Sequence, residues 1–196
     1  MKYFSQVKAA LFLASLYPLL RLFWLAYSNQ LGANPIELIT RSLGTWTLVF
    51  LLITLSITPL RKLSGWSWLV RLRRMSGLFA FFYALLHFIT YIWLDQFFDL
   101  DDIIKDVIKR PFITIGFAAF VLLIPLAITS TNAMIKKLGG KRWQLLHRLI
   151  YVIAIFAVLH YWWLVKKDIT QPLIYATVLA VLLAYRLWAR RIKSAS

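Results

Sequence analysis

Long apolar stretches separated by short polar segments dominate the pattern of hydrophobic and polar positions along this chain. Six of these stretches approach the length of about 20 residues at which an apolar helix crosses the hydrocarbon core of a membrane. Because lipid offers no hydrogen-bond partner to a free backbone amide, each stretch is predicted to be helical. The predicted membrane spans are 9–27, 43–60, 75–94, 111–130, 145–165 and 172–189.

This pattern predicts an all-α integral membrane protein in which residues 1–196 form a single bundle of six transmembrane helices. A transmembrane barrel would need apolar and polar residues to alternate over about ten positions in each strand. Continuous apolar runs such as Leu48 to Leu55 do not alternate in this way. The residues left outside the six spans are too few for a second folded domain, which excludes a soluble catalytic or DNA-binding module.

The distribution of charged residues predicts the orientation of the bundle in the membrane. Hydrophobic residues make up 61% of the 196 positions, yet the formal net charge is +16. If both termini are cytoplasmic, sixteen of the 23 lysines and arginines fall on the cytoplasmic side, and all seven acids fall on the other side. Cytoplasmic loops of membrane proteins carry such a positive excess. We therefore predict that both termini are cytoplasmic and that the basic loops contact anionic membrane lipids, with no nucleic acid as partner.

Three histidines are the candidate functional residues, because His87, His147 and His160 each lie in or at the end of a predicted span. Ionisable side chains are costly inside a membrane and therefore mark functional sites. The third and fifth spans run in the same direction, which places His87 and His160 at similar depth near the outer face. Two imidazoles at one depth on different helices can ligate a haem iron from opposite faces. The chain has no cysteine, which excludes thiolate-held iron–sulfur clusters and covalently attached haem.

His147 is predicted to lie apart from this pair. It precedes His160 by 13 residues, or about 20 Å along a straight helix, which places it near the cytoplasmic end. A second haem there would need a histidine on the third span at the position of Arg73 or Arg74. One haem with two histidine ligands is therefore predicted. Three interpretations of His147 stay open: it helps to bind a second haem or a flavin, it contributes to a quinone site, or it only forms a hydrogen bond.

Several cations are candidate partners for the anionic groups of a cofactor. Haem propionates would attract basic side chains at the outer end, which are Arg41, Arg110, Lys166 and Lys167. Arg21 lies within the first span, where it either pairs with a propionate, extends to the membrane surface or contacts another helix. A flavin phosphate would suit five cytoplasmic cations, although orientation in the membrane alone also accounts for their charges. They are Arg71, Arg73, Arg74, Lys141 and Arg142.

The predicted outer loop 95–110 intersperses apolar residues with aspartates at nearly helical spacing. Such a segment is typical of a short amphipathic helix that lies on the outer leaflet. The alternative interpretation is an acidic docking surface for a periplasmic partner.

Eight short segments occur in a fixed order along nearly the whole chain. They are LGANP (31–35), RLRRMSGL (71–78), HFITY (87–91), RPFITIG (110–116), TSTN (129–132), WQLLH (143–147), HYWW (160–163) and QPLIY (171–175). With them the chain resembles the ferric-reductase-like transmembrane family, and within it the haem-binding subunits of bacterial methionine sulfoxide reductase systems.

This resemblance implies a b-type cytochrome of the bacterial inner membrane. Such a protein would take electrons from quinol and pass them to MsrP, a periplasmic molybdopterin enzyme that reduces methionine sulfoxide in oxidised proteins. The resemblance also implies FMN as a cofactor, haem ligation by His87 and His160, and a match between His147 and a third family histidine.

The chain has no G-x-G-x-x-G motif and no C-terminal flavin and nicotinamide domain of the kind found in the larger ferric reductases. An electron-transfer subunit is therefore expected, with no catalytic residue of its own. The alternative is a non-redox membrane protein, either a small transporter or an assembly scaffold, which would carry no chromophore.

Overall fold

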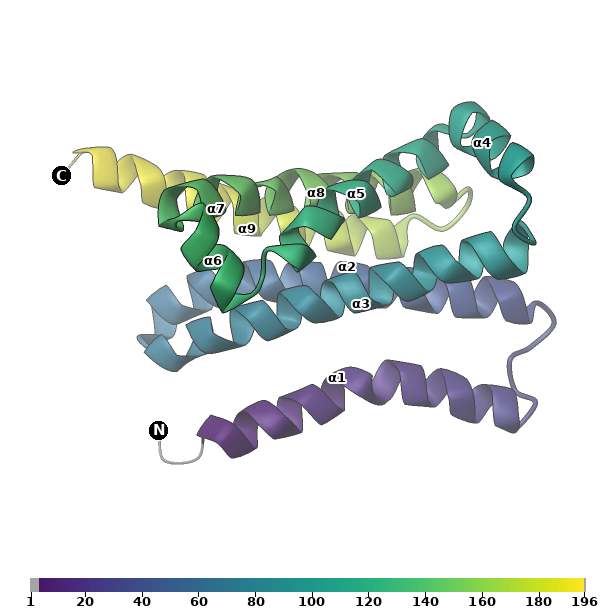
Figure 1. The fold of residues 1–196 in the computed structure, drawn as a ribbon, viewed down its shortest axis with the longest axis horizontal. Helices are drawn as coiled ribbons and strands as arrows, with labels where there is room; N and C mark the ends of the chain where they lie inside the picture. Colours follow the sequence, from purple (N-terminus) through teal and green to yellow (C-terminus); the bar gives the residue numbers. More distant parts are fainter. Residues whose placement is uncertain (1–3, 196) are drawn as a thin grey trace.

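A computed structural model describes residues 4–195, and for Arg190 and residues 193–195 it describes the backbone alone. The described chain is helical throughout and contains no strand (Figure 1). Its elements are α1 (Phe4–Tyr27), α2 (Pro35–Ser64), η1 (Ser67–Leu72), α3 (Arg73–Thr90), η2 (Tyr91–Asp95), α4 (Leu100–Lys109), α5 (Pro111–Ile128), α6 (Asn132–Leu138), α7 (Gly140–His147), α8 (Leu149–Leu164) and α9 (Thr170–Ala195).

Six segments of the described chain are long and apolar enough to cross a membrane, which confirms the predicted all-α class with six spans. The third of them joins η1, α3 and η2, and the fifth joins α7 and α8. The predicted single domain 1–196 extends beyond the described residues at both ends.

The second span is much longer than predicted, because α2 has 30 residues and begins at Pro35. Two local signals set this start. The Asn34 side chain accepts a hydrogen bond from the Glu37 amide, and Pro35 occupies the first turn, where a missing amide hydrogen costs nothing. At the other end Gly65 adopts a left-handed conformation, with φ of 74°, and closes the helix.

The helices lie roughly along one axis, with α2 beside α3, α5 beside α8, and α9 against α2 and α8 (Figure 1). Helix α1 packs less extensively. Phe12 lies against Phe79 with ring centroids 5.2 Å apart, and the Tyr83 hydroxyl donates to the Ser15 carbonyl at 2.7 Å. The start of α1 and the end of α9 lie at one end of the bundle, here called the terminal end, and α4 lies at the other, here called the α4 end.

The loop before α5 contains the predicted short helix, α4, whose first turn is capped by the side chain of Asp99. Leu100, Ile104 and Ile108 form an exposed apolar stripe on one face of it. The turn before α4 is unusual, because Phe97 and Phe98 adopt left-handed conformations with φ of 47° and 62°. Such values are rare for bulky residues.

Candidate functional site

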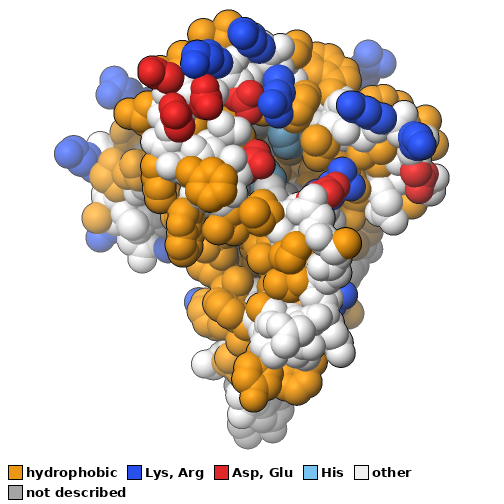
Figure 2. Space-filling model, turned by 90° about the vertical axis from the view of Figure 1, so that its right-hand side faces the viewer, with side chains coloured by type: hydrophobic (Ala, Val, Ile, Leu, Met, Phe, Trp, Pro, Cys, Tyr) orange, Lys and Arg blue, Asp and Glu red, His pale blue; other side chains and the backbone are white. Residues whose placement is uncertain are grey.

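The two ends of the bundle each contain a cavity lined by histidine. The His87–His160 cavity has a volume of about 290 Å³ and lies toward the α4 end. The His147 cavity has a volume of about 880 Å³ and lies toward the terminal end. Figure 2 looks onto the α4 end, where acidic and basic side chains surround a hollow in which histidine is visible.

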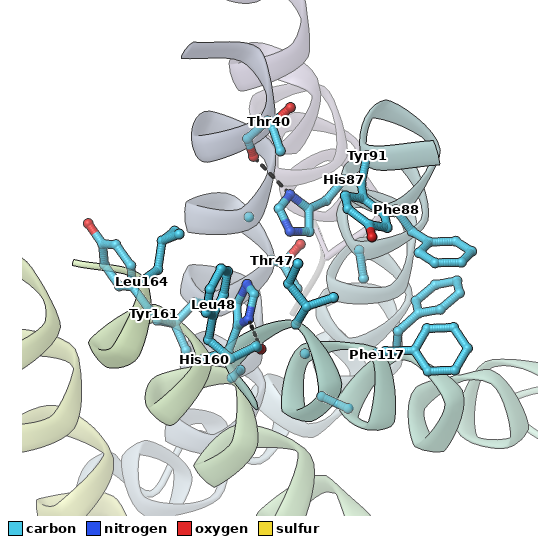
Figure 3. Close-up of a pocket in the computed structure, with 18 of the residues that line it drawn as sticks. Thr40, Thr47, Leu48, His87, Phe88, Tyr91, Phe117, His160, Tyr161 and Leu164 are labelled. Carbon is cyan, nitrogen blue, oxygen red and sulfur yellow. Dashed lines mark hydrogen bonds between the residues drawn. The ribbon is translucent and has the colours of Figure 1, made fainter. Parts of the chain in front are cut away.

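In the first cavity, α3 and α8 bring the predicted pair of histidines together. The ring centroids of His87 and His160 are 6.1 Å apart, and their planes are inclined by 74°. Both rings project into the same space between α2, α3, α5 and α8 (Figure 3).

Each ring is held by a backbone carbonyl of a neighbouring helix. The Nδ1 atom of His87 lies 2.8 Å from the Thr40 carbonyl oxygen, and that of His160 lies 2.6 Å from the Phe112 carbonyl oxygen. A carbonyl can only accept a hydrogen bond, so Nδ1 is the protonated nitrogen in both rings. Both Nε2 atoms therefore present a lone pair, the form in which imidazole binds a metal ion.

Two glycines make room for these rings. A Cβ atom at Gly44 would lie 3.1 Å from Cε1 of His87, and one at Gly116 would lie 2.6 Å from Nδ1 of His160. Gly44 lies one helical turn after Thr40, whose carbonyl holds the His87 ring. Gly116 lies one helical turn after Phe112, whose carbonyl holds the His160 ring. The two halves of the cavity are therefore built in the same way, from a carbonyl in one membrane span, a glycine one turn later and a histidine in the next span.

The residues fit a haem better than a bare metal ion. The described part of the chain contains no group of three or more His, Cys, Asp or Glu that could hold a metal ion, so two imidazoles alone would leave most of its coordination positions empty. A macrocycle supplies four further nitrogens. His87 and His160 would hold the iron of such a group, and their ring centroids are 6.1 Å apart. The hydroxyl of Thr40, which lines this cavity, is buried without a hydrogen-bond partner.

The mouth of this cavity is polar and contains two of the predicted propionate partners. Arg41 pairs with Glu37 at 2.6 Å, and Arg110 pairs with Asp106 at 3.2 Å. Asp106 also accepts a hydrogen bond from Gln96 at 3.0 Å, which ties α4 to the end of the third span. The other three cations proposed as partners, Arg21, Lys166 and Lys167, do not line the cavity. Arg21 lies on the exposed side of α1.

The His147 cavity is strongly cationic. Three of the five cations predicted for a cofactor phosphate line it together with three further cations, whereas Lys141 and Arg142 do not. No Asp or Glu belongs to its lining. The six cations are Lys8, Arg71, Arg73, Arg74, Arg148 and Arg186. Two of them are fixed by hydrogen bonds within the protein: Arg74 donates to Asn132 Oδ1, and Arg186 donates to the Leu55 carbonyl, both at 2.7 Å.

His147 is held by a different set of contacts from the other two histidines. Its Nε2 atom lies 3.1 Å from the hydroxyl oxygen of Thr129, and its ring stacks on Trp143 with centroids 3.9 Å apart. Trp143 in turn donates its indole N–H to the Thr129 carbonyl at 2.9 Å. Thr129 thus fixes both aromatic side chains.

The sequence singled out all three histidines and the three arginines, and the structure divides them between the two cavities. It did not single out Thr40 or Gly44, and it noted Phe112, Gly116 and Thr129 only as parts of recurring segments. Each glycine lies four residues after the residue whose carbonyl accepts the imidazole hydrogen bond.

Known proteins similar to this chain bear on the site. A family described as "Ferric reductase like transmembrane component" matches residues 40–158, which include His87 and His147 and end two residues before His160. A relative from Herminiimonas arsenicoxydans is 62% identical over 96% of this chain and 88% of its own length. A relative from Azospira oryzae is 58% identical over 95% of this chain and 80% of its own length. A relative from Rhodospirillum rubrum is 54% identical over 92% of this chain and 86% of its own length. All three are named protein-methionine-sulfoxide reductase heme-binding subunit MsrQ.

Proposed function

Because the chain belongs to the ferric-reductase-like transmembrane family, together with the MsrQ haem-binding subunits, we propose that it binds haem b and carries electrons across the bacterial inner membrane. The pair His87 and His160 carries this proposal, since both rings enter one cavity with centroids 6.1 Å apart and each Nε2 presents a lone pair. Haem supplies the redox chemistry when it is bound.

The protein's own groups have three tasks in this proposal. The carbonyls of Thr40 and Phe112 fix the tautomer and the orientation of the two imidazoles. His87 and His160 would hold the haem, and two histidine ligands would favour electron transfer over oxygen binding. Apolar residues such as Leu48 and Leu123 line the cavity and keep water away from it.

The proposed direction of transfer is outward. The terminal end, with its cationic cavity, is proposed to face the cytoplasm, and the excess of positive charge supports this orientation. The α4 end then faces the periplasm. Quinol is the proposed donor, and MsrP, a periplasmic methionine sulfoxide reductase, is the proposed acceptor. FMN is proposed to occupy the His147 cavity, with its phosphate near Arg71, Arg73 and Arg74.

The absorbance spectrum is the decisive test of haem binding. The purified protein, expressed with ample haem, is expected to show a Soret band that shifts when a reduced quinol is added. A non-redox transporter or scaffold would show no such band. Absence of the band from correctly folded protein would refute the proposed function.

Docking of the reductase is proposed at the acidic surface formed by Asp99, Asp101 and Asp102 beside the cavity mouth. Replacing these three aspartates with lysine is expected to slow electron delivery to MsrP while the haem spectrum stays the same. Replacing lysines 136 and 137 with glutamate, on α6 at the terminal end, provides a matched control. Equal rates for the acidic-surface variant and the wild type would exclude this surface.

A further inference from the structure

Helix α4 forms part of the wall of the His87–His160 cavity. Val107 on this helix and Arg110 directly after it belong to the cavity lining. The apolar stripe of the same helix is exposed. Figure 2 shows the hollow at this end open between charged side chains. One helix of ten residues therefore contributes both to the cavity wall and to the molecular surface at the α4 end.

Asp106 fastens this helix to the bundle. Its carboxylate accepts a hydrogen bond from the Gln96 side chain at 3.0 Å and a longer one from the Tyr91 hydroxyl at 3.4 Å, and it pairs with Arg110 at 3.2 Å. The Asp106 side chain is 15% exposed, whereas that of Asp102 on the same helix is 61% exposed. Tyr91 and Arg110 both line the cavity, so one carboxylate joins α4 to two groups of the cavity wall.

Irregular backbone flanks α4 on both sides. Before it, the third span ends in the π-helical turn η2, and Phe97 and Phe98 adopt left-handed conformations. After it, Arg110 has an extended backbone with φ of −112° and ψ of 98°, and α5 begins at the next residue. Near this second segment the Thr114 hydroxyl donates to the Val107 carbonyl. A rigid helix between two irregular segments can turn as a unit, because a few residues at its ends absorb the change in φ and ψ.

The charge of haem favours entry at this end of the cavity. Haem is anionic because its propionates are ionised, and carrying charge through lipid between the membrane spans is costly. The mouth at the α4 end offers polar groups instead, since Arg41 and Arg110 line it. An opening there admits the macrocycle and leaves the propionates near cations. Movement of α4, which borders the mouth, would widen that opening.

We propose that α4 is a hinged lid of the His87–His160 cavity and that Asp106 latches it, so that haem enters and leaves when the latch opens. Asp106 is a positioning residue, since it acts through α4 and through the wall groups it holds. This inference rests on the proposed function, in which haem is the group admitted. A latch that makes the same contacts before and after binding changes the path and not the bound state. Weakening it therefore speeds entry and exit alike and leaves the dissociation constant nearly the same.

Haem exchange by the full chain in detergent tests the lid. Asp106→Asn keeps the shape of the side chain and removes its charge. It is expected to raise the rate constants of haem binding and of haem loss each about tenfold, while the dissociation constant changes less than about threefold. Stopped-flow absorbance of the apoprotein mixed with haem gives the first rate constant, and transfer of haem to excess apomyoglobin gives the second.

The matched control is Lys105→Gln, which breaks the exposed ion pair with Asp102 on the same helix and is expected to leave both rate constants unchanged. Faster loss of haem from Asp106→Asn without faster binding would make Asp106 an ordinary contact of the bound state and would overturn the lid. Two unchanged rate constants would overturn it as well.

Because the chain has no cysteine, the lid can also be fixed chemically. In Gln96→Cys/Asp106→Cys, dibromobimane would join two positions whose side chains meet at 3.0 Å in the wild type. The joined apoprotein is expected to bind haem at least about tenfold more slowly than the same protein before joining. Asp102→Cys/Lys105→Cys, joined in the same way, is the control, because it links two positions within α4 and leaves the lid free to turn. An unchanged rate in the joined Gln96→Cys/Asp106→Cys protein would show that haem enters elsewhere.

Hydrogen exchange of the apoprotein gives a readout that does not depend on haem. In Asp106→Asn the amides of α4 are expected to exchange several-fold faster than in the wild type, while those of α5 keep their rates, because the latch releases one helix and not the bundle. Equal acceleration throughout the chain would indicate general destabilisation and would overturn the latch. A wild type that binds no haem would refute the proposed function, whereas α4 amides unaffected by Asp106→Asn would refute the latch, so the two failures are distinguishable.

Discussion

In the two histidine cavities the protein contacts opposite nitrogens of the imidazole ring. In the His87–His160 cavity, backbone carbonyls hold Nδ1, glycines make room beside the rings, and most other neighbours are apolar. In the His147 cavity, a threonine hydroxyl holds Nε2, a tryptophan stacks on the ring, and six cations surround it. A histidine within a membrane is therefore not a haem ligand by its presence alone. The partner of its other nitrogen decides what it can bind.

The largest contrast is expected from removing the histidines themselves. His87→Ala and His160→Ala are each expected to abolish nearly all haem binding, because an iron left with one axial ligand in this cavity loses half of its protein coordination. His147→Ala is expected to keep the haem. The measurement is haem per polypeptide in purified protein. Equal losses in all three variants would remove the distinction between the cavities.

A second variant tests the barrier between the cavities. Leu123 lines both of them and is only 4% exposed. Leu123→Ala is expected to lower the free energy of unfolding by about 2–4 kcal/mol, because the space left behind fills only partly. Thermal unfolding in detergent, followed by circular dichroism, measures the loss. Leu63→Ala, at a position 75% exposed, is the control and is expected to cost less than about 0.5 kcal/mol. Similar losses in both would mean that the barrier is not tightly packed.

The glycines test whether room beside the rings matters. Gly116→Ala is expected to weaken haem binding about tenfold, because its Cβ would lie 2.6 Å from His160 and push the ring from its carbonyl. Gly44→Ala is expected to have a smaller effect, since its nearest contact is 3.1 Å. Gly140→Ala, where a Cβ meets nothing within 4 Å, is the control. Haem titration of the apoprotein gives the affinities, and the reverse order for Gly116 and Gly44 would contradict the geometry.

The smallest effect is expected from a charge at the cavity mouth. Arg110 lines the mouth and is partly neutralised by Asp106. Arg110→Gln is expected to lower the reduction potential by about 20–40 mV, because a nearby cation disfavours the more positive oxidised iron. Lys105→Gln, at an exposed position of α4, is expected to change the potential less. A redox titration followed by absorbance measures both. A rise in potential for Arg110→Gln would show that this charge does not act on the haem.

Much of the fold could be predicted because membrane spans are encoded in length and apolar composition. The start of α2 was missed for a physical reason. Its first turns contain Glu37, Thr40 and Arg41, and such polar residues are not typical of a membrane span. Only Asn34 and Pro35, at the helix start, indicate that the helix begins there. Capping is a local signal, and an apolar pattern does not contain it.

The site could be predicted only in part. Histidine and arginine were visible in the sequence because their side chains carry the chemistry. The carbonyls of Thr40 and Phe112 were not, since every residue has a carbonyl and only the packing of two helices decides which one meets an imidazole. Gly44 and Gly116 make room for the rings because they lack a Cβ atom. Which glycine faces a ring depends on the rotation of each helix about its own axis. The same uncertainty in rotation left Arg21 as a candidate partner, although it lies on the exposed side of α1.

The left-handed backbone conformations of Phe97 and Phe98 oppose stability to exposed aromatic surface. A residue with a Cβ atom in this conformation costs about 1 kcal/mol compared with glycine, so glycine at either position would be the obvious choice for a more stable protein. Such a change would remove an aromatic ring that is 79% or 63% exposed at the α4 end. The chain therefore keeps two costly conformers in a place where the rings add nothing to the core. A variant optimised for stability alone would lose exposed aromatic surface at the end from which electrons are proposed to leave.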